Sequence, residues 1–246
     1  MSAAEDINRM TRGKKNPLKE GTKRYPASGR NSSAEVSSVL DRIGTKLRFA
    51  RGSTIFNEGD PIISLYKVIS GAVRLCKYTA GGRRQIADFT LPEEFFGFVR
   101  VGDHMLTAEA ITDVVLISYP VQQVERLGDE MPAIRKRLFD FLSERVLGMQ
   151  DHLVMLGRQT AIERVAAFLL LLLERNAPGR GNAVDLPMSR LDIADYLGLT
   201  LETVSRALAD LKHAHAIDLE GPHLVLVRDV EAMRSLAAGD DGKRPA

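Results

Sequence analysis

The sequence predicts an α+β protein in which a β-rich region, one long helix and a compact helical region with a short β-hairpin follow one another. Three observations carry this prediction. Short β-prone runs separated by glycine and proline turns argue for an all-β barrel or sandwich. A helical periodicity replaces them near Pro132 and continues for about seven turns. Two short amphipathic helices joined by a glycine turn then precede two further β-runs.

Composition sets the outer limits. A chain of 246 residues fits one or two domains, and a formal net charge of +2 does not by itself point to nucleic acid. The single cysteine, Cys76, excludes an internal disulfide and any metal or iron–sulfur site built from several cysteines. No apolar run reaches the ~18 residues of a membrane span, and the N-terminus lacks the apolar core of a signal peptide. We therefore expect a cytoplasmic protein without membrane contact.

The two ends of the chain differ in composition from the rest. Residues 1–40 are rich in Lys, Arg, Ser, Gly and Asn and cannot bury a core, so we expect a disordered, solvated basic tail. A tail that adds weak, non-specific attraction to DNA is the alternative. Residues 237–246 have the same character. Between them we expect a β-domain over 41–128, a long helix over 129–157 and a compact helical domain with a β-hairpin over 158–236.

The β-domain prediction rests on six short runs rich in β-branched and aromatic residues, punctuated by turns such as Ser70-Gly71 and Gly81-Gly82. The predicted strands are Thr54–Phe56, Ser64–Ile69, Ala72–Tyr78, Gln85–Phe89, Ala108–Ala110 and Val114–Tyr119.

The long helix is predicted to join two copies of the chain. Its apolar residues recur at steps of three, four or seven, with charged residues on the other faces, as in a two-helix seam. The predicted dimer residues are Ile134, Leu138, Leu142, Met149, Leu153 and Leu156. A helix packed only on its own β-domain is the alternative, but one small barrel can hardly cover so long a helix.

Capping signals locate the helices that follow. Thr160 and Glu163 form a capping-box pattern that starts a helix over 161–175. Ser189 and Asp192 repeat the pattern before a short helix, Gly198 fits the tight turn, and Thr200 can cap a second helix. This is a helix-turn-helix, whose second helix enters the major groove of DNA. The run from Leu219 to Val227, with its turn at Gly221-Pro222-His223, is expected to form a β-wing that touches phosphates.

Three residues of the second helix share one face of one turn: Glu202, Ser205 and Arg206. Arg can bond two acceptors of guanine, Glu can accept from the amino group of cytosine, and Ser is small enough to approach a thymine edge. The alternative is a solvated Glu–Arg ion pair, worth only ~0.3–0.5 kcal/mol. The full set of predicted DNA-binding residues is Glu202, Ser205, Arg206, Thr200, Thr203 and Ser189.

This chain order resembles that of the catabolite activator/FNR (Crp/FNR) superfamily of transcription regulators, over about residues 45 to 235. The resemblance implies a cyclic-nucleotide-binding-like β-roll, a long dimerisation helix and a winged helix-turn-helix. In the β-domain it rests on Gly52, Ile55, Glu58-Gly59-Asp60, Tyr66, Gly71, Gly82-Arg83, Phe96-Gly97 and Ala110. In the DNA-binding part it rests on Leu191-Asp-Ile-Ala-Asp-Tyr-Leu-Gly198 and Glu202-Thr-Val-Ser-Arg206.

The E-x-x-S-R pattern of Glu202, Ser205 and Arg206 resembles the FNR/FixK branch rather than the catabolite activators. That likeness implies a homodimer, a target near TTGAT-N4-ATCAA, transcription activation and a contact with RNA polymerase. The FNR iron–sulfur cluster needs four cysteine ligands, which this chain lacks, so the FixK-like group is the better match. No P-loop, GxSxG or HExxH motif is present, and we do not expect an enzyme.

The expected sensing side departs from the cyclic-nucleotide binders. Gly97-Phe98 and Leu106-Thr107 stand at the positions where the cyclic-nucleotide binders have Gly-Glu and Arg-Ser or Arg-Thr. The cation that would neutralise a cyclic phosphate is therefore missing, unless Arg100 replaces it. We therefore expect no cofactor and no metal site, and we expect Cys76 to be a core residue. Phe95, Phe96 and Phe98 could fill the pocket. The alternative is a sensor that depends on haem or a nucleotide, with His104 or His152 as the only axial haem ligands.

Overall fold

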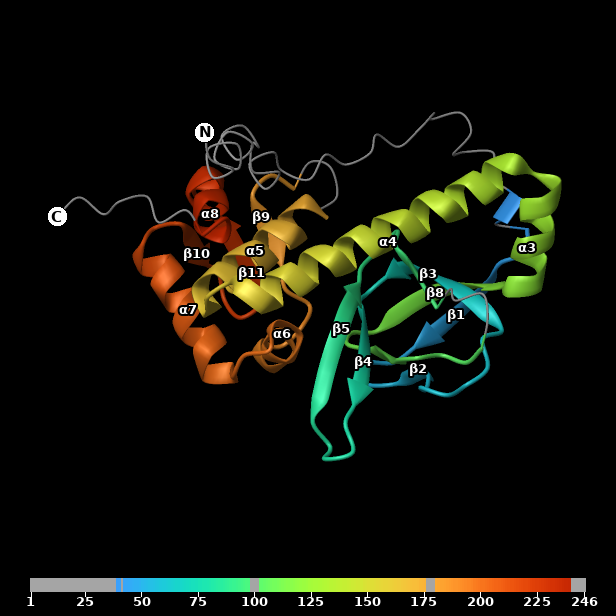
Figure 1. Cartoon of the computed structure of the whole chain (residues 1–246), viewed down its shortest axis with the longest axis horizontal. Helices are drawn as coiled ribbons and strands as arrows, with labels where there is room; N and C mark the ends of the chain where they lie inside the picture. The colour runs from blue at the N-terminus through green and yellow to red at the C-terminus, as the bar shows by residue number, and fades with distance from the viewer. Residues whose placement is uncertain (1–38, 41, 98–101, 176–179, 240–246) are drawn as a thin grey trace, which may run out of the picture.

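The structure is a computed structural model that describes residues 39–40, 42–97, 102–175 and 180–239. Two β-sheets lie at one end of the molecule, a compact helical part lies at the other, and the long helix α4 (Pro132–Arg158) runs past both (Figure 1). The predicted α+β fold class is confirmed. The predicted tail 1–38, Phe98, Arg100 and the last residues 240–246 lie outside the described residues.

Among the described residues, eight strands form two antiparallel four-stranded sheets, in the orders β1-β8-β3-β6 and β2-β7-β4-β5. We call this pair of sheets the β-roll. Its strands are β1 (Thr45–Phe49), β2 (Thr54–Phe56), β3 (Ser64–Ser70), β4 (Val73–Tyr78), β5 (Arg84–Thr90), β6 (Phe95–Phe96), β7 (Thr107–Ala110) and β8 (Val114–Pro120). The six predicted strands are all present, and β1 and β6 are additional.

Alternation along the strands turns one face of each sheet inward. In β4, Val73 and Leu75 point into the β-roll, whereas Arg74, which lies between them in the strand, is on the outer face. Gly71 joins β3 to β4 with a φ of +84°, and a Cβ there would lie 2.2 Å from the carbonyl oxygen of Asp113. Only glycine fits this turn, which aligns the two strands on opposite sheets.

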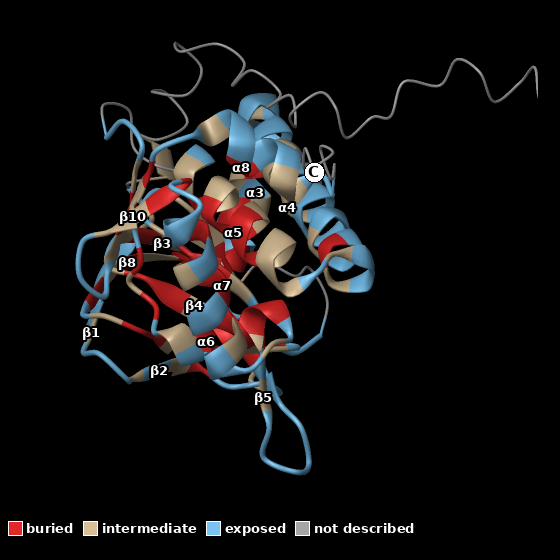
Figure 2. Ribbon diagram, turned by 90° about the vertical axis from the view of Figure 1, so that its left-hand side faces the viewer, coloured by how far each residue is buried: buried red, intermediate tan, exposed pale blue. Residues whose placement is uncertain are grey.

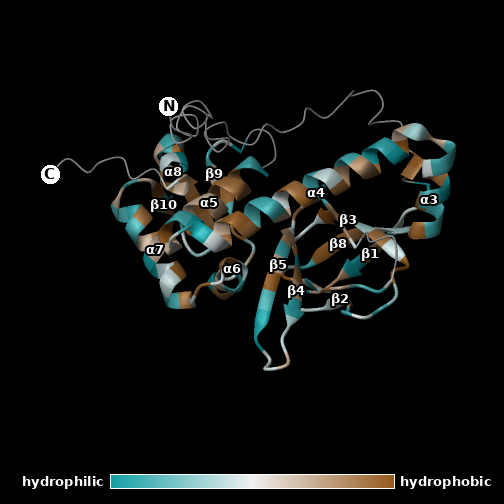
Figure 3. Cartoon of the chain, viewed as in Figure 1, coloured by the Kyte–Doolittle hydropathy of each residue, from teal (hydrophilic) through white to brown (hydrophobic). Residues whose placement is uncertain are grey.

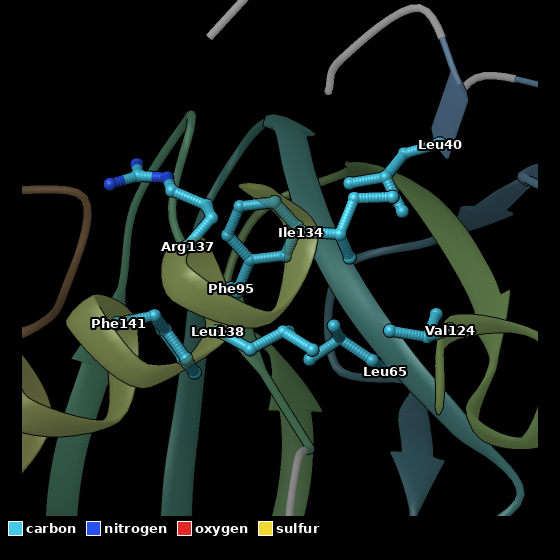
Figure 4. A pocket seen from close by; sticks show the side chains of 8 residues that line it. All are labelled: Leu40, Leu65, Phe95, Val124, Ile134, Arg137, Leu138 and Phe141. Carbon is cyan, nitrogen blue, oxygen red and sulfur yellow. The ribbon is translucent and has the colours of Figure 1, made fainter. Parts of the chain in front are cut away.

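Two helices follow the β-roll. The sequence prediction missed the first, α3 (Val121–Glu130), and placed the start of the long helix a few residues early. The long helix α4 begins at Pro132, because proline has no N–H to donate and suits the first helical turn. A small apolar pocket lies where α3 and α4 meet the sheets, with Phe95 and Ile134 among its walls (Figure 4).

Over residues 161–175 and 180–239, the C-terminal part of the structure has four helices and a three-stranded sheet of order β10-β11-β9. Its elements are α5 (Ala161–Glu174), β9 (Ala183–Asp185), α6 (Arg190–Leu197), α7 (Leu201–His213), β10 (Ile217–Leu219), β11 (Leu224–Val227) and α8 (Val230–Ala237). The helix predicted over 161–175, the helix-turn-helix and the wing hairpin are present, whereas β9 and α8 were not predicted. Within the part of the chain that the structure describes, no helix is long and apolar enough to cross a membrane.

The predicted bounds of both tails include residues that belong to the folded structure. Leu40 lies in a helical turn and lines the small pocket between α4 and the β-roll, so it belongs to the packed structure. Ala237 is the last residue of α8, and its carbonyl oxygen accepts a hydrogen bond from Nε2 of Gln159. Apolar contacts explain the correction at Leu40, and the last turn of the missed helix α8, bonded to Gln159, explains the correction at Ala237.

The outer face of the β4–β5 hairpin packs directly on the helical part. Phe89 of β5 lies with its ring centre 6.1 Å from that of Phe168 in α5 and 5.3 Å from that of Tyr196 in α6. Cys76 and Ile86 belong to the same buried cluster. Figure 2 shows buried residues, in red, in both the sheets and the helices at this junction. One apolar core therefore spans the β-roll and the C-terminal part.

Candidate DNA-binding surface

Local capping defines the helix-turn-helix. Ser189 caps α6: its Oγ accepts from the backbone N of Asp192 at 3.1 Å, and Oδ2 of Asp192 accepts from the backbone N of Ser189 at 3.0 Å. Gly198 ends α6 in the left-handed conformation, with a φ of +63°. Two residues later Thr200 caps α7, since its Oγ1 accepts from the backbone N of Thr203 at 3.2 Å. The turn between the helices is therefore short and tightly held.

A shared core fixes the angle between α6 and α7. Ile193 and Leu197 of α6 and Val204 and Leu208 of α7 are at most 3 % exposed. Because these residues occupy the inner face of α7, the opposite face must point into solvent. That outer face carries the residues predicted to read DNA.

Glu202, Ser205 and Arg206 are all exposed at the N-terminal end of α7. The Ser205 hydroxyl donates to the carbonyl oxygen of Leu201 at 2.9 Å, which leaves its lone pairs free. The pKa of Glu202 lies below its usual value because the backbone of the first turn and the Thr200 hydroxyl favour the charged form, and Arg206 contributes least. The Glu202–Arg206 attraction is thus a minor one, and no ion pair joins these two side chains among the described residues.

Of the other three predicted residues, Ser189 and Thr200 are helix N-caps, and Thr203 lies in the first turn that Thr200 caps. The Oγ1 atoms of Thr200 and Thr203 are hydrogen-bonded to each other at 3.0 Å. The Ser189 hydroxyl donates to Oδ2 of Asp192 at 2.7 Å. The structure therefore places them at the two helix N-termini, where free backbone N–H groups face outward and attract phosphate. Their hydroxyls are engaged in these local hydrogen bonds, which hold the two helix N-termini in place.

Arg190 was missed by the sequence prediction. It is the first residue of α6, and its Nη1 is buried without a hydrogen-bond partner among the described residues. Burial lowers the pKa of this guanidinium, because water is removed and no carboxylate replaces it. Its position between the capping residues Ser189 and Asp192 was visible in the sequence, but its lack of a partner was not.

The dimer surface predicted on α4 needs a correction. Ile134 is only 1 % exposed and Leu138 packs against the cluster formed by Leu65, Tyr119 and Val124, so Ile134 is not available to a second chain. Leu156 is half-buried beside the helix-turn-helix. A different apolar stripe faces solvent, at steps of three and four residues; we call it the α4 stripe. It consists of Phe139, Leu142, Val146, Met149 and Leu153, which are 38–70 % exposed.

Figure 3 shows apolar segments, in brown, recurring along α4. The face turned toward the β-roll explains some of them, since Ile134 and Leu138 line the small pocket of Figure 4. The α4 stripe lies on another side of the helix, and its five apolar residues follow one another at the heptad steps of three and four. Three of the six predicted dimer residues, Leu142, Met149 and Leu153, therefore remain candidates.

The interior of the β-roll is occupied by its own side chains. Phe96 is 2 % exposed, and its ring stacks 5.3 Å from that of Tyr66, while His104 stacks 3.5 Å from Phe56. The suggestion that Phe96 fills the pocket is thus correct. Phe95 instead points outward and meets Phe141 of α4 at 5.8 Å, because adjacent residues of a strand face opposite sides.

Both histidines that could have bound haem are engaged. His104 is buried against Phe56, and burial lowers its pKa. Nε2 of His152 lies 3.0 Å from the carbonyl oxygen of Tyr196, and its ring stacks on the Tyr196 ring. Cys76 is fully buried, and burial followed by the charge of Glu109 raises its pKa to about 11, which keeps the thiol protonated and inert.

Comparison with known proteins agrees with this architecture. Residues 46–130 match the family model of the cyclic nucleotide-binding domain, and residues 163–236 match that of the Crp-like helix-turn-helix domain. The first match covers the β-roll and α3, and the second covers α5 to α8. Within the first match, Leu106 and Thr107 depart from the Arg-Ser or Arg-Thr of the cyclic-nucleotide binders.

Several curated relatives are regulators of nitrogen fixation. The chain is 41% identical over 180 residues to the nitrogen fixation regulation protein FixK of Bradyrhizobium diazoefficiens, spanning 72% of this chain and 76% of that one. It is 42% identical over 188 residues to FixK of Rhizobium meliloti, spanning 75% and 83%. The solved structure of FixK2 from Bradyrhizobium japonicum superposes with a TM-score of 0.76 at 35% identity, covering 83% of this chain and all of the other.

Proposed function

Since the chain belongs to the Crp/FNR family of DNA-binding transcription regulators and is similar to its FixK members, we propose that it binds a TTGAT-N4-ATCAA-like palindrome as a homodimer. One observation carries the proposal: Glu202, Ser205 and Arg206 stand exposed together on the first turns of a helix whose opposite face is fully buried. Such a rigid helix can enter the major groove with its N-terminal residues against base edges.

The α4 stripe supports the homodimer. Its five side chains are exposed in a single chain, and apolar residues at heptad spacing gain stability when a second helix covers them. Two such helices side by side would place one helix-turn-helix on each side of a two-fold axis. A palindrome has the same symmetry, with half-sites about 34 Å apart.

Activation through contact with RNA polymerase, in the cytoplasm where DNA is transcribed, forms the rest of the proposal. It rests on relatives rather than on geometry. One 36% identical relative is the transcriptional activatory protein AadR of Rhodopseudomonas palustris, and one 35% identical relative is the transcriptional activator protein FnrA of Stutzerimonas stutzeri.

We further propose that DNA binding needs no small-molecule effector. Within the described residues the β-roll interior holds Phe56, Tyr66 and Phe96 in mutual contact, with His104 stacked on the first of them. A ligand would have to displace these rings. The abundance of the chain would then set its activity.

Fluorescence anisotropy with effector-free full-length protein tests the proposed function. We expect tight binding to a labelled TTGAT-N4-ATCAA duplex and much weaker binding to a scrambled duplex at one fixed salt concentration. An absorbance scan and a mass spectrum of the same preparation check for haem or a bound nucleotide. Equal affinity for both duplexes would contradict the proposed target, and a Soret band or a bound nucleotide would favour ligand-dependent control.

Arg190 gives a separate prediction about phosphate binding. We expect Arg190→Ala to weaken binding to specific and scrambled duplexes by the same factor, and to reduce the slope of log K against log salt by about one. The reason is that the Arg190 guanidinium at the start of α6, which no carboxylate of the described residues neutralises, can neutralise one phosphate but cannot read a base. Anisotropy titrations at four salt concentrations measure the slope. Arg234→Ala is the control, since Arg234 pairs with Glu231 on α8, away from the helix-turn-helix. A loss confined to the specific duplex would contradict this role.

A further inference from the structure

One carboxylate, that of Asp192, connects the helix-turn-helix to the β-roll. Its Oδ2 accepts from the backbone N and the hydroxyl of Ser189, which closes the first turn of α6. Its Oδ1 faces the sheets and lies 2.6 Å from Nη2 of Arg84 and 3.0 Å from Nη1 of Arg74. The side chain of Asp192 is only 7% exposed. The group that starts α6 therefore also anchors α6 to strands β4 and β5.

Arg84 binds a second carboxylate one turn further along the same helix. Its Nε donates to Oδ2 of Asp195 at 2.8 Å, and Nε2 of Gln85 donates to the backbone carbonyl of Asp195 at 2.6 Å. The other end of the network is fixed within the β-roll, where Nε of Arg74 donates to Oε2 of Glu109 at 2.7 Å. We call Arg74, Arg84, Asp192 and Asp195 the β5–α6 clamp. Figure 1 shows β5 passing directly beside α6.

The clamp restricts the angle at which α6 packs on the β-roll, which the apolar contacts of the junction do not. Contacts such as Phe89 against Tyr196 are not directional, and similar burial is available over a range of angles. A guanidinium is a planar fork that fits its acceptors in one orientation. Arg84 and Asp192 have side chains that are 16% and 7% exposed, so each would lose its partner in a poorly hydrated place if α6 turned away.

From this geometry we infer that Arg84 and Arg74 are positioning residues for DNA reading: they fix the pose of the helix-turn-helix relative to the β-roll, on which α4 packs, and thereby the separation of the two recognition helices in a dimer. The inference rests on the proposed function, because that separation matters only when two helices read one palindrome. Its ligand is a duplex with two half-sites at one defined spacing. The clamp sets the preferred spacing without touching DNA.

A spacing series tests this role. The duplexes carry TTGAT and ATCAA separated by three, four, five or six nucleotides, and a further duplex carries one half-site. We expect wild-type protein to prefer one spacing clearly. Arg84→Ala should lose affinity for that spacing on the order of tenfold and discriminate less among the others, with half-site affinity unchanged. Arg84→Lys should behave like Arg84→Ala, because a lysine keeps the charge but not the fork.

Arg83→Ala is the matched control. Arg83 is exposed, directly precedes Arg84, and has no side-chain ion pair among the described residues, so its replacement removes the same charge without touching the clamp. We expect its spacing preference to match that of wild type. Equal effects of Arg83→Ala and Arg84→Ala would overturn the inference and assign the loss to general attraction between Arg and DNA. An unchanged spacing preference in Arg84→Ala would overturn it as well. Thermal unfolding of every variant verifies that each is folded.

A distance measurement tests the clamp without DNA. Nitroxide labels at Arg48→Cys in β1 and His213→Cys in α7 report the pose within one protomer, since both positions are exposed and Cys76 is fully buried. Dilution with unlabelled chain removes distances between protomers. We expect one narrow distance distribution in wild type and Arg83→Ala, and a broad one in Arg84→Ala. A narrow, unshifted distribution in Arg84→Ala would overturn the clamp. If wild type bound no palindrome but the distributions behaved as expected, the proposed function alone would fail.

Discussion

Replacing Arg206 with alanine is expected to weaken binding to the palindrome by about 1–3 kcal/mol and to relax the preference for G·C at one position of each half-site. The expectation follows from an exposed guanidinium on the first turns of α7 whose attraction to Glu202 is minor. Anisotropy titrations against the palindrome, single-base variants of it and a scrambled duplex measure both effects. Affinity for the scrambled duplex should fall much less.

Lys212→Ala is the control for charge. Lys212 lies in the last turn of the same helix, far from the N-terminal end that carries Arg206. Its loss removes one positive charge and should leave the discrimination between palindrome and scrambled duplex unchanged. If Arg206→Ala lowered affinity equally for both duplexes, Arg206 would be a phosphate contact and not a base reader.

Met149→Glu is expected to separate the dimer into monomers. Met149 is the fourth residue of the α4 stripe and is 66% exposed in one chain, so a second helix would bury it. The substitution places two like charges opposite each other in an apolar seam, which we expect to cost about 3–5 kcal/mol. Sedimentation velocity at several protein concentrations measures the dimerisation constant. Binding to the palindrome should fall with it, whereas binding to a single half-site should remain.

Leu147→Glu is the control that shows whether the dimer dissociates only when the charge lies in the α4 stripe or with a charge elsewhere on α4. Leu147 is 47% exposed on α4 but lies outside the heptad spacing of the α4 stripe. This variant should remain dimeric. A dimer that tolerates Met149→Glu and dissociates with Leu147→Glu would place the interface on another face of α4.

The recognition helix could be predicted closely because its signals are local. Ser189, Asp192, Gly198 and Thr200 lie within a few residues of the backbone groups that they satisfy, and capping chemistry depends little on the rest of the fold. The inner face of α7 follows from the same short-range periodicity. The exposed position of Glu202, Ser205 and Arg206 therefore needed no knowledge of distant contacts.

The predicted dimer residues partly failed because α4 has two apolar faces. A step of four residues rotates around a helix by only about 40°, so a series of such steps can pass from one face to the next. Ile134 and Leu138 lie against the β-roll, whereas Leu142, Met149 and Leu153 lie on the open side. The sequence contains both series and does not mark the change between them. Only the position of the β-roll shows where it occurs.

Other misses depend on contacts between distant residues. The two-residue strand β6 is defined by pairing with β3, and its sequence is too short to show a period. The β5–α6 clamp joins Arg84 to Asp192, which are 108 positions apart. Neither residue is unusual in its own segment. Such pairs appear only when the topology brings β5 to α6.

The continuous core between the β-roll and the helical part has a consequence for turnover in the cell. Phe89 and Tyr196 belong to segments matched by different family models, yet each is buried by the other, so loosening either module exposes apolar surface on both. The two modules then unfold as one cooperative unit, and a protease that depends on transient opening meets a single barrier rather than two. We therefore expect the lifetime of this regulator to follow the stability of the whole chain, so that a weakness introduced in the β-roll shortens the life of the DNA reader as well.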